Sequence, residues 1–344
     1  MIFHQIATER GCQSYFLACE ETCMAVVIDP EETLLDRYLG LAAQEGVRLH
    51  YVLDTHTHAD HFSGGKELAQ RLRIPLIMHR NSPAPFVDMR VDDGEKINLG
   101  KLSLNLIHTP GHTADSLCVL VKDRVFTGDT LLIGGCGRSD LPTGDADQLF
   151  DSLFNKLLLL DPATRVYPAH IYSDRDYSTL AEEAEHNPRL QLKQRDDFVQ
   201  QMRTLTLREP DHLSEALRTN LTGGKTVEQL IAEAAHSVSF MSLEEVLRRT
   251  NTDDPEIILL DVREREEFAA GHIAGAIHIP RGQLELRVNQ ALQDPTLRIV
   301  VYCEYGRIST LATATLRDMG FTRAVAMDQG LQLWREKNYP LTEK

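Results

Sequence analysis

The sequence predicts an α/β protein made of two domains, and three observations lead to this prediction. Short apolar runs alternate with helical patterns from Gln13 to Asn220. The alternation stops at Thr222-Gly223-Gly224, and a second series of strands and helices follows Ser237. With 344 residues, of which 42% are hydrophobic, the chain has enough apolar material for two cores. We therefore expect one domain over residues 1–237 and another over residues 238–344.

Strands and helices are expected to alternate along the first domain. Apolar runs bounded by turn residues predict strands at 14–18, 24–28, 49–53, 76–78, 102–107, 117–121 and 125–126. Apolar residues at helical spacing predict helices at 32–44, 63–73, 145–160 and 178–187. Two mixed sheets packed face to face, with helices outside, would fit this order.

The loop after the strand at 49–53 carries four metal-binding side chains: His56, His58, Asp60 and His61. On an extended run alternate residues face the same way, so His56 and His58 project together, while the other two continue into the turn. Imidazole and carboxylate groups at this density suggest a transition metal. The alternative is a polar loop whose histidines cap a helix or satisfy buried carbonyl groups.

Three later residues complete the set, and His112, Asp129 and His170 each follow an apolar run at a glycine or proline turn. Loops at the ends of strands are common positions for functional sites, because the sheet beneath them is rigid. The His-x-His-x-Asp-His pattern with these three residues resembles the metallo-β-lactamase superfamily over roughly residues 1–220. The resemblance implies an αββα sandwich.

Composition limits the partners of the chain. A net charge of −15 argues against a nucleic-acid partner and against an anionic membrane surface. No apolar run approaches the roughly 20 residues of a membrane span, and the first residues lack a basic, signal-like start. We therefore expect a soluble, cytoplasmic protein. Six cysteines in a chain of this length do not indicate a disulfide scaffold.

The second domain is expected to be a small α/β unit with a parallel sheet. Its predicted strands are 257–261, 299–302 and 324–327, and its predicted helices are 243–249, 264–269 and 309–319. Cys303 lies between a buried strand and a helix, where backbone N–H groups and the positive end of the helix dipole favour a thiolate and then a persulfide. The alternative is a buried structural cysteine.

Three segments around this cysteine resemble a rhodanese domain over residues 239–344: Leu260 to Phe268, Gly271 to Ala276, and Asp328-Gln329-Gly330 with Trp334. The resemblance implies that Cys303 is a sulfur carrier and that Arg307 contacts its substrate. Rhodaneses usually carry arginine at the position of Ile308, whereas here Arg307 stands one place earlier. Glu304 also places a negative charge beside the cysteine. These departures leave the substrate and the rate of sulfur transfer open.

Two further segments of the first domain resemble the persulfide dioxygenase branch of the superfamily. They are Gly134 to Asp140, which contains Arg138, and Asn187-Pro188-Arg189-Leu190. Hydroxyacylglutathione hydrolases share part of the first segment, but Ser139-Asp140 favours the dioxygenase. The chain departs from that branch after His170, where Ile171-Tyr172-Ser173-Asp174 stands. By resemblance, Tyr172, Arg138 and Arg189 are expected to contact the substrate.

The dioxygenase resemblance implies one ferrous ion held by His56, His112 and Asp129. Two histidines and one carboxylate leave open positions for a persulfide sulfur and O₂. The residues that would then orient these ligands are His58, Asp60, His61 and His170. In a two-metal hydrolase the same four would hold a second ion, with Asp129 bridging, and the ligand set alone does not decide between the two.

The function implied by both resemblances is oxidation of glutathione persulfide by O₂ and water to sulfite and glutathione. The second domain would move sulfane sulfur between thiosulfate and glutathione through Cys303. One alternative is a zinc or binuclear glutathione thioester hydrolase, similar to glyoxalase II, with a sulfur-binding rhodanese module. Another is a sulfur-sensing protein without catalysis. The expected partners are small molecules, and the sequence leaves open whether the chain forms a homo-oligomer.

Overall fold

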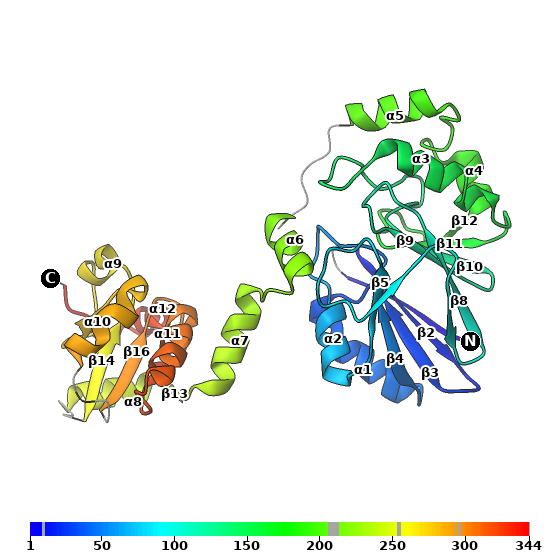
Figure 1. Cartoon of the computed structure of the whole chain (residues 1–344). Coiled ribbons are helices and arrows are strands. Elements are labelled where there is room, and N and C mark those ends of the chain that lie inside the picture. The colour runs from blue at the N-terminus through cyan, green and yellow to red at the C-terminus, as the bar shows by residue number, and fades with distance from the viewer. Residues whose placement is uncertain (9–10, 206–212, 253–255, 293, 295–296, 344) are drawn as a thin grey trace. The chain divides into compact units, whose positions relative to one another are not determined.

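The computed structural model describes residues 1–8, 11–205, 213–252, 256–292, 294 and 297–343 (Figure 1). The chain divides into two compact units, Met1–Gly224 and Lys225–Lys344. Helix α7 (Val227–Ser237) belongs to the second unit, because it packs against helix α11 (Arg307–Asp318). The two compact units meet between Gly224 and Lys225, before this helix. The domain boundary expected after residue 237 stays a prediction.

Two six-stranded sheets form the centre of the first unit. The first sheet has the order β1 (Ile2–Ala7), β2 (Gln13–Cys19), β3 (Met24–Ile28), β4 (Arg48–Leu53), β5 (Leu76–His79) and β6 (Met89–Val91). The second has the order β12 (Ser178–Thr179), β11 (Arg165–Pro168), β10 (Arg124–Gly128), β9 (Leu117–Val121), β8 (Leu102–His108) and β7 (Lys96–Leu99). Both sheets are mixed, since β3 to β6 pair in parallel in the first, and β10 and β11 do so in the second.

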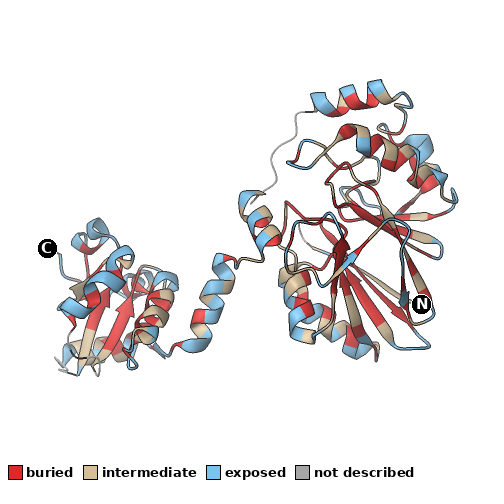
Figure 2. Cartoon of the chain, in the orientation of Figure 1, coloured by how far each residue is buried: buried red, intermediate tan, exposed pale blue. Residues whose placement is uncertain are grey.

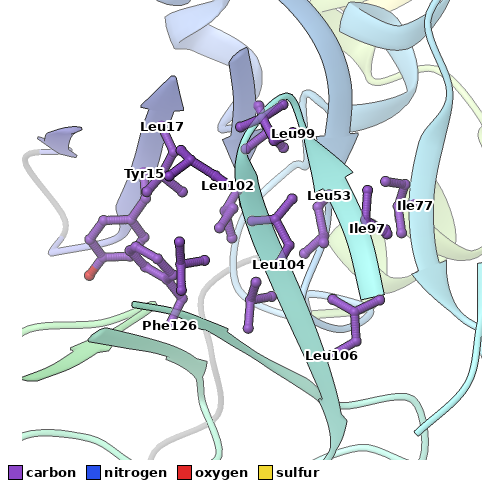
Figure 3. Packing of buried hydrophobic residues seen from close by; sticks show 14 of the residues in the cluster. Tyr15, Leu17, Leu53, Ile77, Ile97, Leu99, Leu102, Leu104, Leu106 and Phe126 are labelled. Atoms are coloured by element: carbon purple, nitrogen blue, oxygen red, sulfur yellow. The ribbon is translucent and has the colours of Figure 1, made fainter. Parts of the chain in front are cut away.

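The side chains of each strand alternate between two cores. Tyr15 and Leu17 of β2 face the other sheet, whereas Phe16 and Ala18 face the helices. Successive side chains of a strand point to opposite faces of the sheet, so a strand buried on both faces needs apolar residues at consecutive positions. Figure 3 shows residues from both sheets meeting in the inner core, among them Tyr15, Leu17, Leu53, Leu104, Leu106 and Phe126.

Helices cover the outer faces of this sandwich, which confirms the αββα architecture. Helices α1 (Leu35–Gln44) and α2 (Gly65–Leu72) pack on the first sheet. Helices α3 (Ala146–Phe154), α4 (Leu180–His186) and α5 (Arg195–Thr204) pack on the second. Short 3₁₀ turns lie at η1 (Glu32–Leu34) and η2 (Leu157–Leu159), and α6 (Leu213–Thr222) ends the unit.

The prediction of a single helix at 145–160 is wrong. Helix α3 ends at Phe154, and the separate 3₁₀ turn η2 follows it. Asn155 occupies the C-cap, and its side chain donates to Asp151 Oδ1 at 2.6 Å. Asparagine is a weak helix former that favours such end positions, so it stops the helix although the apolar spacing continues.

The second unit is a five-stranded sheet with helices on both faces, and all its strands are parallel, which confirms the expected parallel sheet. Its order is β13 (Phe240–Met241), β17 (Val325–Met327), β16 (Arg298–Tyr302), β14 (Ile257–Asp261) and β15 (Ile277–His278). Helices α10 (Leu284–Ala291) and α11 cover one face, and α8 (Leu243–Asn251) and α12 (Leu331–Glu336) cover the other. The remaining elements are α9 (Arg265–Ala269) and η3 (Arg281–Gln283).

Burial follows this layering in both units, since the central strands are buried and the outer faces of the helices are exposed (Figure 2). A parallel sheet covered on both faces needs such apolar strands, and β16 is buried from Ile299 to Tyr302. Among the described residues, no helix combines the length and the apolar character that crossing a membrane would require.

Candidate metal centre and candidate sulfur-carrying cysteine

Metal-binding side chains at the ends of the strands form three groups in the first unit. Most of them come from the loops that follow β4, β8, β10 and β11, while Cys12 precedes β2 and Asp29 follows β3. Within each group the possible ligand atoms lie within 4.8 Å of one another. The groups are His56, His112 and Asp129; Cys12, Asp60, His61 and His170; and Asp29, Asp54 and His58. The three expected ligands are therefore brought together, and His58 lies in a different group from Asp60, His61 and His170.

His56 presents a free ring nitrogen to its group. The hydroxyl of Thr55 donates to Asp29 Oδ2 (2.9 Å), so its oxygen accepts from Nδ1 of His56 (2.9 Å). Nε2 of His56 is buried and has no hydrogen-bond partner among the described residues. Burial, together with the neighbouring His58, lowers the pKa of His56 well below its ordinary value and keeps the ring neutral. A neutral imidazole with a free Nε2 is suited to bind a metal ion.

His112 and Asp129 complete the group. Nδ1 of His112 donates to the carbonyl oxygen of Arg138 (2.8 Å), which leaves Nε2 free and 3.5 Å from Asp129 Oδ2. Burial opposes ionisation of Asp129, but the charge and the hydrogen bond of His170 hold the pKa of Asp129 below its ordinary range. Two imidazoles and one carboxylate, with the unpartnered nitrogen of His56, fit a divalent metal ion such as ferrous iron.

Asp29 links two of the histidines. Its Oδ1 accepts from the backbone N–H of Thr55 (2.6 Å) and lies 3.1 Å from Nε2 of His58. Through the hydroxyl of Thr55 the same carboxylate also fixes the orientation of His56. Asp29 stands directly after the strand at 24–28 and belongs to none of the motifs seen in the sequence, so this positioning role was missed.

Cys12 is a second residue that sequence reasoning missed. It is buried, and an antiparallel bridge joins its backbone to that of His170. Burial opposes its ionisation, but hydrogen bonds with His170 and His61 lower the pKa of Cys12 to about 6. Its neighbours lie far away along the chain, so no local sequence pattern connects this cysteine with the histidine motif.

Two further polar side chains fix the motif loop. Asp115 accepts from the N–H (3.1 Å) and the hydroxyl (2.6 Å) of Thr57, and from the hydroxyl of Thr113 (2.6 Å). Asn220 in α6 donates to two carbonyl groups of the loop, both at 2.8 Å. These hydrogen bonds hold the loop that carries the candidate ligands in one conformation.

A cavity of about 460 Å³ opens onto the candidate metal group. Its wall includes all three expected substrate contacts of this domain, Arg138, Tyr172 and Arg189. The ring of Tyr172 stacks on that of His170, with centroids 6.0 Å apart, and Arg138 pairs with Asp140 at 2.6 and 2.7 Å. The structure thus places these residues beside the candidate ligands, while their contact with a substrate stays a prediction.

Glycine is required at one point of the cavity wall. A Cβ atom added at Gly137 would lie 2.1 Å from the carbonyl oxygen of Asp129 and 2.9 Å from Nδ1 of His112. Any side chain here would push against the two ligand-bearing segments. This close approach gives a physical reason for the glycine in the segment from Gly134 to Asp140.

In the second unit, Cys303 follows β16 and is almost fully buried. Its Sγ accepts from the backbone N–H of Ser309 (3.2 Å) and lies 3.4 Å from the Ser309 hydroxyl oxygen. Gly306 turns the loop with a φ of +80°, a conformation that favours glycine, and α11 begins at the next residue. The turn therefore directs a backbone donor of the first helical turn at the sulfur, as a thiolate or persulfide anion needs.

Comparison with known proteins matches this two-part organisation. Residues 8–170 match the metallo-beta-lactamase superfamily, and residues 242–337 match the rhodanese-like domain. The mitochondrial persulfide dioxygenase ETHE1 of Bos taurus is 35% identical over 228 residues, which cover 65% of this chain and 89% of that protein. The chain belongs to the metallo-beta-lactamase superfamily. Its superfamily domain is followed by a rhodanese-like domain, so both resemblances seen in the sequence are confirmed.

Two other proteins are similar to the superfamily domain. The solved structure of ETHE1 from Myxococcus xanthus has a TM-score of 0.63 and 39% identity, and it covers 65% of this chain and 100% of that chain. A hydroxyacylglutathione hydrolase of Pseudoalteromonas translucida is 33% identical over 206 residues, 59% of this chain and 77% of that protein. These relatives therefore include persulfide dioxygenases and also a hydrolase of the alternative type.

Proposed function

We propose that the first unit is a persulfide dioxygenase that holds one ferrous ion through His56, His112 and Asp129. It would convert glutathione persulfide, O₂ and water into glutathione and sulfurous acid, which ionises to sulfite. The sulfane sulfur loses four electrons, and O₂ accepts them. The observation that carries this proposal is the group of two imidazoles and one carboxylate at the cavity, in a chain similar to persulfide dioxygenases.

The residues of the chain would bind and orient the substrate. The ion itself would supply open positions that can bind a persulfide sulfur and O₂. Arg138 and Arg189 on the cavity wall are suited to bind the carboxylates of glutathione. His170 donates from Nδ1 to Asp129 Oδ1 at 2.7 Å and pairs through Nε2 with Asp60 at 2.5 Å, so it fixes the carboxylate ligand.

In the second unit, Cys303 would carry sulfane sulfur. Its thiolate attacks the outer sulfur of thiosulfate, a sulfur–sulfur bond forms, and sulfite leaves with the electron pair of the broken bond. A glutathione thiolate then attacks the outer sulfur of the cysteine persulfide, and glutathione persulfide leaves as the thiolate of Cys303 is restored. The N–H of Ser309 would stabilise the anionic sulfur at each stage. The product is the substrate of the first unit, and the same steps can run in reverse.

The second candidate function is a glutathione thioester hydrolase with two metal ions. The observation in its favour is the group of Asp60, His61 and His170 beside Asp129, together with the hydroxyacylglutathione hydrolase relative. In this case Asp129 would bridge two ions. Cys12 belongs to the same group, so a second ion would have a thiol among its neighbours.

An oxygen electrode separates the two functions. Protein purified without oxygen and loaded with ferrous iron should consume O₂ on addition of glutathione persulfide and form sulfite in equal amount. It should leave S-lactoylglutathione unhydrolysed. Thioester hydrolysis without oxygen uptake would instead support the hydrolase. A cytoplasmic location stays a prediction from the sequence, which makes no prediction of the oligomeric state.

A further inference from the structure

A cavity of about 260 Å³ lies beside Cys303 in the second unit. Its wall consists of residues from the cysteine loop, from α11 and from α7: Val227, Ile231, Cys303, Glu304, Tyr305, Arg307, Ile308 and Leu311. Helix α7 packs along α11, outside the sheet and its covering helices (Figure 1). The surroundings of the cysteine are therefore shaped partly by a helix that precedes the rhodanese-like match.

Most of this wall is hydrocarbon. Its apolar lining comes from Val227 and Ile231 of α7, from Ile308 and Leu311 of α11, and from the aromatic ring of Tyr305. Val227 and Ile308 are 50% and 47% exposed, so apolar surface stands open to water beside the sulfur. Covering such surface with an apolar ligand is favourable in proportion to the area removed from water.

The two charged residues of the wall already have partners. Glu304 accepts from Arg263 at 3.3 Å through one carboxylate oxygen and pairs with Arg335 through the other. Arg307 pairs with Glu228 of α7. A dianion entering the cavity would have to displace Glu228 from Arg307, or lie near Glu304 without a free cation. Either case costs free energy. In the first, an existing ion pair is broken; in the second, the dianion gives up water and meets a negative charge with no cation to compensate it.

We propose that this cavity receives the apolar group of an organic sulfane-sulfur compound, and that Cys303 takes sulfur from such compounds in preference to thiosulfate. This inference rests on the proposed sulfur transfer at Cys303 and names its substrate class. With a thiosulfonate, the Cys303 thiolate attacks the outer sulfur and forms a sulfur–sulfur bond. The bond from that sulfur to the sulfonyl sulfur breaks, and an organic sulfinate leaves with the electron pair.

The test compares three donors on the full chain: benzenethiosulfonate, methanethiosulfonate and thiosulfate. The first two carry one negative charge and release a sulfinate, so they differ mainly in the apolar group. The rate at which Cys303 gains one sulfur atom is followed by intact-protein and peptide mass spectrometry, with Cys303→Ser as the blank. Each rate is divided by the rate of free cysteine with the same donor, which removes differences in intrinsic reactivity.

The corrected rate with benzenethiosulfonate should be about 10 times the corrected rate with methanethiosulfonate, because the cavity covers the benzene ring. We call this quotient the benzene-to-methane ratio. Ile231→Ser, which removes hydrocarbon from the α7 wall, should lower this ratio several-fold. Glu228→Gln should free Arg307 and raise the rate with thiosulfate several-fold. Glu233→Gln is the matched control, since Glu233 lies on the same helix, pairs with Lys225 and does not line the cavity.

Two controls show that each variant is folded. The first unit should consume oxygen with glutathione persulfide at the wild-type rate, and the second unit should keep its unfolding temperature. A corrected benzene-to-methane ratio near one would overturn the inference, as would a corrected thiosulfate rate above that of benzenethiosulfonate. In both cases sulfur transfer at Cys303 would still stand. If no donor places sulfur on Cys303, the proposed transfer itself fails and this inference fails with it.

Discussion

Replacing Thr55 by valine should weaken metal binding without removing a ligand. The Thr55 hydroxyl donates to Asp29 at 2.9 Å and accepts from Nδ1 of His56 at 2.9 Å, and the residue is fully buried. Valine keeps the shape but leaves Nδ1 of His56 without this partner, so the tautomer that frees Nε2 is no longer fixed. Loss of such an orienting bond lowers metal affinity by about 10–100-fold. The unsatisfied buried groups should also destabilise the fold by about 1–3 kcal/mol.

The affinity is measured by competition between the metal-free protein and a chromophoric chelator, with the midpoint of urea unfolding recorded in parallel. Thr109→Val is the matched control, because Thr109 is equally buried and its hydroxyl lies 2.9 Å from that of Thr130. The control should lose stability and keep its metal affinity. A folded Thr55→Val protein with the wild-type affinity would refute the role assigned to this hydroxyl.

Three other predictions follow from the two sites. His112→Ala should abolish iron retention and oxygen uptake together, while Cys303 still gains sulfur from a donor; retained iron with full activity would contradict the ligand assignment. Cys303→Ser should remove oxygen uptake with thiosulfate plus glutathione and leave uptake with preformed glutathione persulfide nearly unchanged, because serine cannot carry sulfur; wild-type uptake from thiosulfate would exclude Cys303 as the carrier. A fragment of residues 1–224 should fold and consume oxygen with glutathione persulfide, whereas an insoluble or inactive fragment would show that the two units depend on each other.

Several strands inside a sheet could be predicted from the sequence with both of their ends, although the prediction at 125–126 covers only part of β10. The strands β3, β9 and β14 begin and end at the expected residues, because apolar runs bounded by turn residues are a local signal. Elements with little buried surface were missed. Strand β1 lies at a sheet edge with His4 and Gln5 in its middle, and α10 buries only Leu284 and Val288. Their stability comes from partners that lie elsewhere in the chain.

The candidate ligands could be found because each stands in a short motif at the end of a strand. Their supports could not be found in this way. The roles of Asp29 and Cys12 depend on neighbours that the fold brings from distant segments, namely Thr55 and His170. The contribution of α7 to the Cys303 cavity could not be predicted for the same reason. The apolar face of a short amphipathic helix indicates that the helix packs against another element, but it does not identify that element.

The most direct test is to add ferrous iron in steps to the metal-free protein and to measure oxygen uptake with glutathione persulfide after each addition. With His56, His112 and Asp129 as the ligands of a single ion, activity should rise linearly and reach its plateau at one iron per chain. Zinc should bind without restoring activity, because it has no redox chemistry. A plateau at two metal ions per chain, or thioester hydrolysis restored by zinc without oxygen uptake, would contradict the proposed dioxygenase.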